Sequence, residues 1–164
     1  MFFKNPKVEI IQQKGYNFLW IDDELWMWDI PIEKQCQKEL ADQAYGEVLV
    51  VGYGLGIIQK YLLMNPNVIG KYLLTIEKNE QVMNECGKVY KQIYGGIVIR
   101  DFYKYKTDKK FNCIIGDIWE DILPNCLPQY IKFKKKAQEL LAPDGKILAW
   151  GQDYFEYLIA KQGG

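Results

Sequence analysis

The chain has 164 residues, which is enough to bury one hydrophobic core but short for two domains. Its 21 Lys and Arg residues balance its 21 Asp and Glu residues, so there is no sequence-wide basic field and we expect no nucleic-acid partner. No apolar run reaches the ~18 residues that would suggest a membrane span, and the N-terminus lacks the layout of a signal peptide. We therefore expect a cytoplasmic protein with no membrane partner.

The sequence contains no histidine. A Ser-His-Asp triad, a Cys-His pair and a conventional zinc site therefore lack their usual residues, and we expect no metal. The four cysteines form no C-x-x-C pair, and Cys86 and Cys113 fall at predicted core positions. Acid–base chemistry would have to come from Asp, Glu, Lys or Tyr.

The first 30 residues predict a small β structure. Two aromatic, apolar runs, 18–21 and 24–28, flank Asp22 and Asp23, a layout typical of a β-hairpin. We expect residues 1–30 to form a hairpin appendage and residues 31–164 to form the main domain. The tryptophans of the hairpin could line an apolar pocket or bind a cation, although such aromatics more often form a hydrophobic cover.

A predicted helix from Pro31, with Ile32, Cys36 and Leu40 on one face, leads to the most informative stretch of the chain. An apolar run over 47–51 enters three alternating glycines, which precede a helical pattern: Gly52, Gly54 and Gly56. A buried strand, a glycine turn and a helix start are typical of a nucleotide-cofactor site, because glycine allows close ligand approach and the helix start offers free N–H groups.

The spacing of the glycines discriminates among cofactors. A dinucleotide fingerprint would need glycine where the chain has Ile57, and the Gly-Lys-Ser/Thr end of a Walker loop is absent. The remaining pattern, G-x-G-x-G after a hydrophobic strand, favours a ligand without a pyrophosphate.

Later strands are also predicted to end in polar residues. The apolar runs 72–76, 97–100 and 111–116 are followed by Glu77, Asp101 and Asp117, with helical patterns between the runs. This alternation predicts an α/β fold with a mainly parallel sheet, and open parallel sheets bind ligands at the carboxyl ends of their strands.

Taken in order, these segments resemble the class I S-adenosylmethionine-dependent methyltransferases, and within that superfamily most resemble the spermidine synthase branch. The resemblance runs from about Leu19 to Gly151. It rests on six segments. They are a strand-turn-strand entry at 20–25, the glycine motif at 48–56, the second strand with its acid at 67–77, an adenine-binding turn at 100–102, an acid-bearing strand at 111–117 and a turn before strand five at 141–146. The Trp28-Asp-Ile-Pro31 segment with Gly52-Tyr-Gly54 is also similar to guanidinoacetate methyltransferase.

The resemblance implies a Rossmann-like fold that binds S-adenosylmethionine and transfers its methyl group to a small, amine-containing molecule. It assigns the methionyl part of the cofactor to Gly52, Tyr53, Gly54 and Gly56, the ribose to Glu77, and the adenine to Asp101 and Phe102. It makes Asp117 catalytic with Glu120 as its assistant, and we add Trp28 and Trp119 as candidate acceptor contacts. Each residue also has an ordinary structural interpretation as a turn, cap or wall residue.

The chain departs from the spermidine synthase pattern in two places. Leu55 stands where aminopropyltransferases carry an acid within the glycine motif, and Trp119 lies between Asp117 and Glu120, where that family has a small residue. We therefore favour methyl transfer. Aminopropyl transfer, and a non-catalytic nucleoside-binding or oligomeric protein of the same fold, remain alternatives.

The end of the chain predicts strand five at 146–150 and a short helix around Tyr154, Tyr157 and Leu158. A methyltransferase sheet usually adds an antiparallel strand pair here, so the predicted C-terminus is shortened and strand five would be an open edge. We expect a second copy of the chain, forming a homo-oligomer, or the N-terminal hairpin to cover it. The lysines at 132–136 could bind phosphate, but a solvated helix face explains them at least as well.

Overall fold

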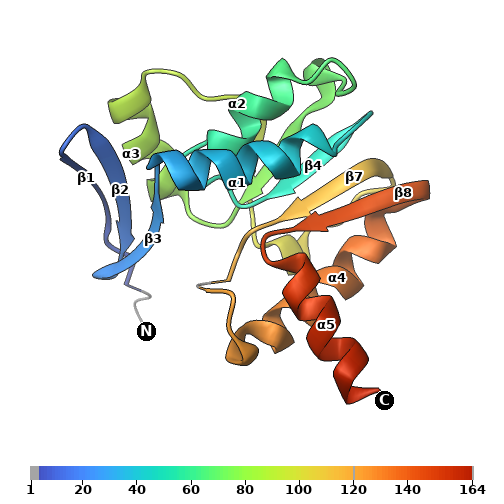
Figure 1. The fold of residues 1–164 in the computed structure, drawn as a ribbon. Helices are drawn as coiled ribbons and strands as arrows, with labels where there is room; N and C mark the ends of the chain where they lie inside the picture. Colours follow the sequence, from blue (N-terminus) through green and yellow to red (C-terminus); the bar gives the residue numbers. More distant parts are fainter. Residues whose placement is uncertain (1–3, 120, 164) are drawn as a thin grey trace.

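The computed structural model describes residues 4–119 and 121–163. At its centre is a five-stranded sheet in the order β6-β5-β4-β7-β8, and every neighbouring pair is parallel (Figure 1). Its strands are β4 (Val48–Val51), β5 (Leu74–Glu77), β6 (Gly96–Ile99), β7 (Phe111–Gly116) and β8 (Leu141–Ala149). The predicted α/β architecture with a parallel sheet is confirmed.

Helices cover both faces of this sheet. The helices are α1 (Pro31–Asp42), α2 (Ile57–Met64), α3 (Glu80–Tyr90), α4 (Leu127–Leu140) and α5 (Gln152–Gln162), with short 3-10 turns η1 (Gly70–Tyr72), η2 (Phe102–Lys104) and η3 (Pro124–Cys126). Successive side chains of a strand point to opposite faces. Val48 and Val50 of β4 accordingly pack with residues of α1 and α2, whereas Leu49 and Val51 join the core of α4 and α5.

The predicted apolar face of the first helix is only partly confirmed, because Leu40 packs against the core but Ile32 does not. Ile32 is 68% exposed, while Gln37 and Ala41 are the fully buried residues of α1. The small side chain of Ala41 packs with Val48 and Leu62, and Gln37 makes polar contacts at the sheet edge. The buried side of α1 therefore combines a polar residue, Gln37, with the small residue Ala41.

The N-terminal segment is a three-stranded antiparallel sheet of β1 (Val8–Gln13), β2 (Tyr16–Ile21) and β3 (Glu24–Trp28). The predicted hairpin is β2 and β3, and β1 is an additional strand. This sheet packs beside α3, with Ile10 of β1 and Leu19 of β2 in one apolar cluster with Val82 (Figure 1). Division into an appendage at 1–30 and a domain at 31–164 stays a prediction.

One carboxylate links this small sheet to the rest of the chain. Asp29, which is 7% exposed, accepts hydrogen bonds from the backbone N–H and the side-chain amide of Asn17, at 2.6 and 2.7 Å. The hydroxyl of Tyr90, at the end of α3, donates to the same carboxylate at 3.0 Å. Burial, together with the Asp29 charge, raises the pKa of Tyr90.

The far edge of the parallel sheet is β8. Its partner within the described residues is β7 alone, and the N-terminal sheet lies on the other side of the molecule (Figure 1). The expectation that the hairpin covers this edge is therefore wrong, because its apolar residues pack against α3. A second copy at the edge stays a prediction. From α5, the side chain of Gln152 donates to the carbonyl of Ile147, so the following helix occupies one carbonyl of the edge strand.

The segment predicted as a turn before strand five is a bulge within β8. Leu141 pairs with Phe111, and the next pair joins Lys146 to Cys113, so more residues are used on β8 than on β7. Asp144, within this bulge, has a φ of 60°. The predicted C-terminal helix is α5. No helix in the described parts of the chain is long and apolar enough to cross a membrane.

Candidate functional site

The glycine and acidic residues predicted at the ends of strands lie near one another, because the carboxyl ends of parallel strands are on the same side of the sheet. Gly52, Glu77 and Asp117 follow or end β4, β5 and β7. A cavity of about 30 Å³ lies at these strand ends. It is lined by residues of β3, α1, β4, the glycine loop, α2 and the end of β7: Met27, Gln37, Val50, Gly52, Tyr53, Gly54, Ile58, Ile115 and Asp117. The structure thus brings the glycine loop and the candidate catalytic acid together.

The glycine loop has a backbone that requires glycine. Gly52, Gly54 and Gly56 have φ angles of 93°, 57° and 73°, in the region that residues with a Cβ rarely adopt. The N–H of Gly52 donates to the carbonyl of Ile76 at 2.8 Å, and Gly56 lies immediately before the first turn of α2. The loop is therefore tied to β5 at its start and to a helix N-terminus at its end.

Glu77, the predicted ribose ligand, holds two segments of backbone. One carboxylate oxygen accepts the N–H of Tyr53 at 2.7 Å, and the other accepts the N–H of Asn79 at 3.0 Å. Burial raises the pKa of Glu77, while these backbone donors oppose the rise by favouring the carboxylate. The side chain lies next to the glycine loop and helps to fix it, and its role as a ribose ligand stays a prediction.

Asp117 is held by a residue that we did not predict as part of the site. The amide nitrogen of Gln37 donates to Asp117 at 2.9 Å and to Glu33 at 2.9 Å. Burial raises the pKa of Asp117 to about 7, the hydrogen bond from Gln37 lowers it, and the negative charge of Glu33 raises it. At neutral pH the carboxyl is thus poised between its two protonation states.

Gln37 also has an unused acceptor. Its side-chain oxygen is buried and accepts no hydrogen bond within the parts of the chain that the structure describes. Since buried polar atoms usually have a partner, and Gln37 lines the cavity, this oxygen is suited to receive a donor there. The only sequence signal for Gln37 was its spacing: it lies four positions before Ala41, a small apolar residue on the same face of α1.

We expect Gln37→Leu to lower the free energy of unfolding by about 1–3 kcal/mol, because it leaves two carboxylates without their shared donor. It should also raise the pKa of Asp117, since the lost hydrogen bond favours the charged form. Thermal unfolding and an NMR titration of the Asp117 carboxyl carbon measure the two effects.

The same helix provides a matched control. Gln35 donates to Glu39 at 2.9 Å with the same four-residue spacing, but this pair is exposed. Gln35→Leu should change stability by about 0.5 kcal/mol or less and leave the Asp117 titration unchanged. Equal effects of the two substitutions would show that Gln37 is an ordinary helix-surface residue.

The two predicted adenine residues take different places at the end of β6. One oxygen of Asp101 accepts the N–H of Tyr103 at 2.9 Å, so the side chain caps η2. The ring of Phe102 is buried and lies 5.9 Å from the ring of Phe133. Phe102 would therefore offer a ligand its main chain, while its side chain belongs to the core.

Neither predicted acceptor tryptophan lines the cavity. Trp28 is 38% exposed and its ring contacts Phe18 edge-on, because β3 turns Met27 towards the cavity and its immediate neighbours away from it. Trp119 is 2% exposed and its indole N–H donates to the carbonyl of Trp150 at 3.1 Å. Glu120 lies outside the described residues.

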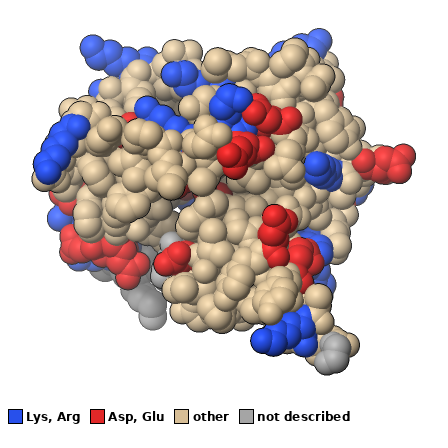
Figure 2. Space-filling view, in the orientation of Figure 1, with Lys and Arg blue, Asp and Glu red and all other residues tan. Residues whose placement is uncertain are grey.

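A larger groove lies at the opposite end of the parallel strands, where β7 and β8 begin. It has a volume of about 470 Å³ and is lined by residues just before β7 and at the end of α4, including Lys106, Asp108, Lys110 and Glu139. Both signs of charge are present there, and charges of both signs are also interspersed on the face shown in Figure 2. Three of the α4 lysines have partners of their own: Lys134 pairs with Glu156, Lys136 pairs with Glu139, and Lys132 lies over the ring of Tyr103. These contacts explain the three lysines without a phosphate.

Comparison with known proteins shows which fold the chain shares with them. No family model matches the chain. Ribosomal RNA small subunit methyltransferase A of Flavobacterium johnsoniae is 27% identical over 115 residues, which cover 68% of this chain and 42% of that protein. The structure of spermidine synthase from Thermotoga maritima aligns with a TM-score of 0.65 and 17% identity, over 90% of this chain and 54% of that one. An S-adenosylmethionine-dependent methyltransferase from Clostridium acetobutylicum aligns with a TM-score of 0.52 and 12% identity, over 74% and 50%. The chain has the class I methyltransferase fold.

The class I fold confirms the resemblance drawn from the motifs. The alignment with spermidine synthase covers more of this chain than the alignment with the Clostridium methyltransferase. The chain spans about half the length of these proteins, or less.

Proposed function

We propose that this chain binds S-adenosylmethionine at the glycine loop and transfers its methyl group to a small, amine-containing acceptor. The observation that carries the proposal is Asp117, a carboxyl with a pKa of about 7 that shares a cavity with Gly52 and Gly54. A carboxyl poised near neutrality is suited to accept a proton from an amine nucleophile.

The polar groups around the glycine loop have the chemistry that this cofactor requires. The cofactor supplies an electrophilic methyl group on a sulfonium. Glu77 lies next to the loop with a carboxylate suited to ribose hydroxyls, and Asp101 lies at the end of β6, where an adenine would be met. Gln37 orients Asp117, and its free oxygen, together with Asp117, would receive N–H groups of the acceptor. The chain's contribution is mainly to align the two reactants and to hold the departing proton at Asp117.

Aminopropyl transfer is the second candidate, favoured by the wide alignment with spermidine synthase. Against it stands Leu55, which is 4% exposed and packs with Leu19 and Val82 in the position where that family carries an acid. The name of the curated relative gives RNA as a competing acceptor class for methyl transfer. The acceptor screen should therefore contain amines and a structured RNA.

The deciding experiment is a calorimetric titration with S-adenosylhomocysteine, compared with 5′-methylthioadenosine. We expect micromolar binding of S-adenosylhomocysteine and a clear preference for it. Preference for methylthioadenosine would replace methyl transfer with aminopropyl transfer. No heat with either ligand, from protein shown to be folded by circular dichroism, would leave a protein of this fold without the proposed cofactor.

A further inference from the structure

The space beside each glycine of the loop is filled by the chain's own side chains. A Cβ atom at Gly54 would lie 2.7 Å from the sulfur of Met27, and one at Gly56 would lie 2.5 Å from the hydroxyl of Tyr53. A Cβ atom at Gly52 would lie 3.1 Å from Ile118. The glycines thus permit a close approach, and in this structure the approaching groups are internal.

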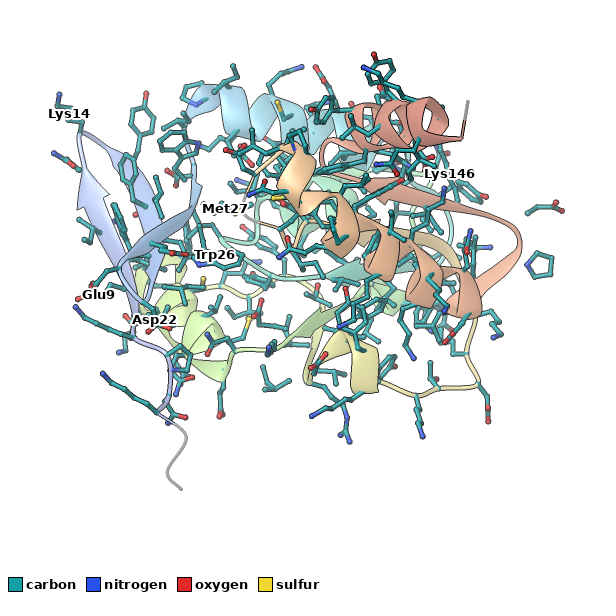
Figure 3. The ribbon with its side chains drawn as sticks, turned by 90° about the horizontal axis from the view of Figure 1, so that it is seen from below. Glu9, Lys14, Asp22, Trp26, Met27 and Lys146 are labelled. Atoms are coloured by element: carbon teal, nitrogen blue, oxygen red, sulfur yellow. The ribbon has the colours of Figure 1, made fainter. Side chains whose placement is uncertain are left out.

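Met27 makes the most direct of these contacts. It comes from β3 and lies between the N-terminal sheet and the rest of the molecule (Figure 3). Its thioether sulfur accepts the backbone N–H of Leu55, 28 positions later in the chain, at 3.3 Å. The sulfur therefore occupies a donor at the tip of the loop where a ligand would bind.

The remaining space is too small for a nucleoside ligand. The cavity of about 30 Å³ holds roughly two water molecules, since one needs about 10–15 Å³. Pockets for small molecules measure about 300–1,000 Å³, at least tenfold more. Any ligand of the proposed size must therefore displace a side chain or a strand.

Met27 is the side chain that can move with the least disturbance. It is unbranched and has three rotatable side-chain bonds. The backbone just after it is fixed, because Asp29 is bonded to Asn17 and Tyr90. By contrast, Tyr53 is 3% exposed and its hydroxyl accepts the N–H of Tyr94, so it is part of the packed structure.

We propose that Met27 is an intramolecular competitor for the cofactor site, which sets the affinity of the site by occupying the glycine loop in the free protein. This inference rests on the proposed function, because it takes the loop as the place where a nucleoside ligand binds. A ligand then binds only the fraction of molecules in which Met27 has turned away, and its apparent affinity is reduced by that fraction.

The test compares Met27→Ala, Met27→Leu and the unaltered protein by calorimetric titration with S-adenosylhomocysteine. Alanine empties the space, and we expect binding on the order of tenfold tighter, the gain when the competing state holds about nine-tenths of the molecules. Leucine still fills the space, so its affinity should stay near that of the unaltered protein. Binding by the alanine variant that is equal or weaker, while the unaltered protein binds, would overturn the proposal and leave the proposed function standing.

A second measurement needs no ligand. Hydrogen exchange at the Leu55 amide, followed by NMR, should be faster in both Met27 variants, because neither has the sulfur acceptor. Met64→Ala is the control, since Met64 is 68% exposed on α2 and its loss should leave this exchange unchanged. Unchanged exchange at Leu55 in both Met27 variants would overturn the placement of Met27. Absence of binding in every protein would instead refute the proposed function.

Discussion

Asp117→Asn is expected to lower turnover by about two to four orders of magnitude, the usual contribution of a positioned acid or base. Asparagine can still accept the hydrogen bond from Gln37, so the local geometry should persist while the ability to take a proton is lost. The measurement is release of S-adenosylhomocysteine with an acceptor found in the amine screen. Calorimetric affinity for S-adenosylhomocysteine is the control and should change little. A variant that keeps full turnover would remove Asp117 from the mechanism.

The same substitution has a pH-dependent effect on stability that needs no acceptor. The pKa of Asp117 is about 7 in the folded protein, against an ordinary value of 3.8 for an aspartate. Between these values the folded state keeps a proton that the unfolded state has lost, so the stability of the unaltered protein falls as pH rises across this range. The asparagine side chain does not titrate and escapes this loss. Asp117→Asn should therefore raise the melting temperature at about pH 8 relative to the unaltered protein, and do so much less at about pH 4. An equal difference at both pH values would contradict a raised pKa.

Trp119→Ala is expected to lower the free energy of unfolding by about 3–5 kcal/mol, as for other large buried aromatics. The indole ring contacts three aromatic rings edge-on, those of Tyr130, Phe133 and Phe155, at centroid distances of 5.7, 5.7 and 5.6 Å. Removing it would leave a cavity and would also leave the carbonyl of Trp150 without its indole donor. Urea unfolding followed by circular dichroism measures the loss.

Trp26→Ala is the matched control, because Trp26 is 38% exposed on β3. Its loss should cost about 1 kcal/mol or less. If Trp119 were instead a wall of the acceptor pocket, its substitution would change KM and leave the stability close to that of the control. That result would restore the assignment made from the sequence.

The sequence predicted the parallel strands and the gathering of glycines and acids at their carboxyl ends, because both are encoded locally. Apolar runs mark strands that are buried on both faces, and the glycines and acids that follow them mark the strand ends. The first strand, Val8–Gln13, was missed because half of it is polar and its pairing with Tyr16–Ile21 has no strong turn signal. Its turn uses Lys14 and Gly15, both with positive φ.

The site residues that were missed depend on contacts between distant segments. Gln37 meets Asp117 across 80 positions of sequence, and Met27 meets Leu55 across 28. Neither contact has a local pattern. The prediction of Trp119 as an acceptor contact was wrong for a related reason. A residue shortly beyond a strand end can point to solvent or into a helix interface, and the packing of α4 and α5 places this side chain in the core. The motif therefore predicts where the candidate site lies, while tertiary packing decides which side chains line it.

The two backbone bonds of Glu77 bear on how this protein could change over time. Because the carboxylate joins the glycine loop to the start of α3, a mutation there would weaken the fold whether or not a nucleoside ever binds. Selection for folding alone would then keep glutamate at the end of β5 in a descendant that had lost all chemistry. Asp117 has no such protection, because its ionised form is a burden on the folded state. A lineage that stopped using the site should lose Asp117 first and keep Glu77, so the identity of residue 117 in relatives is the more sensitive record of activity.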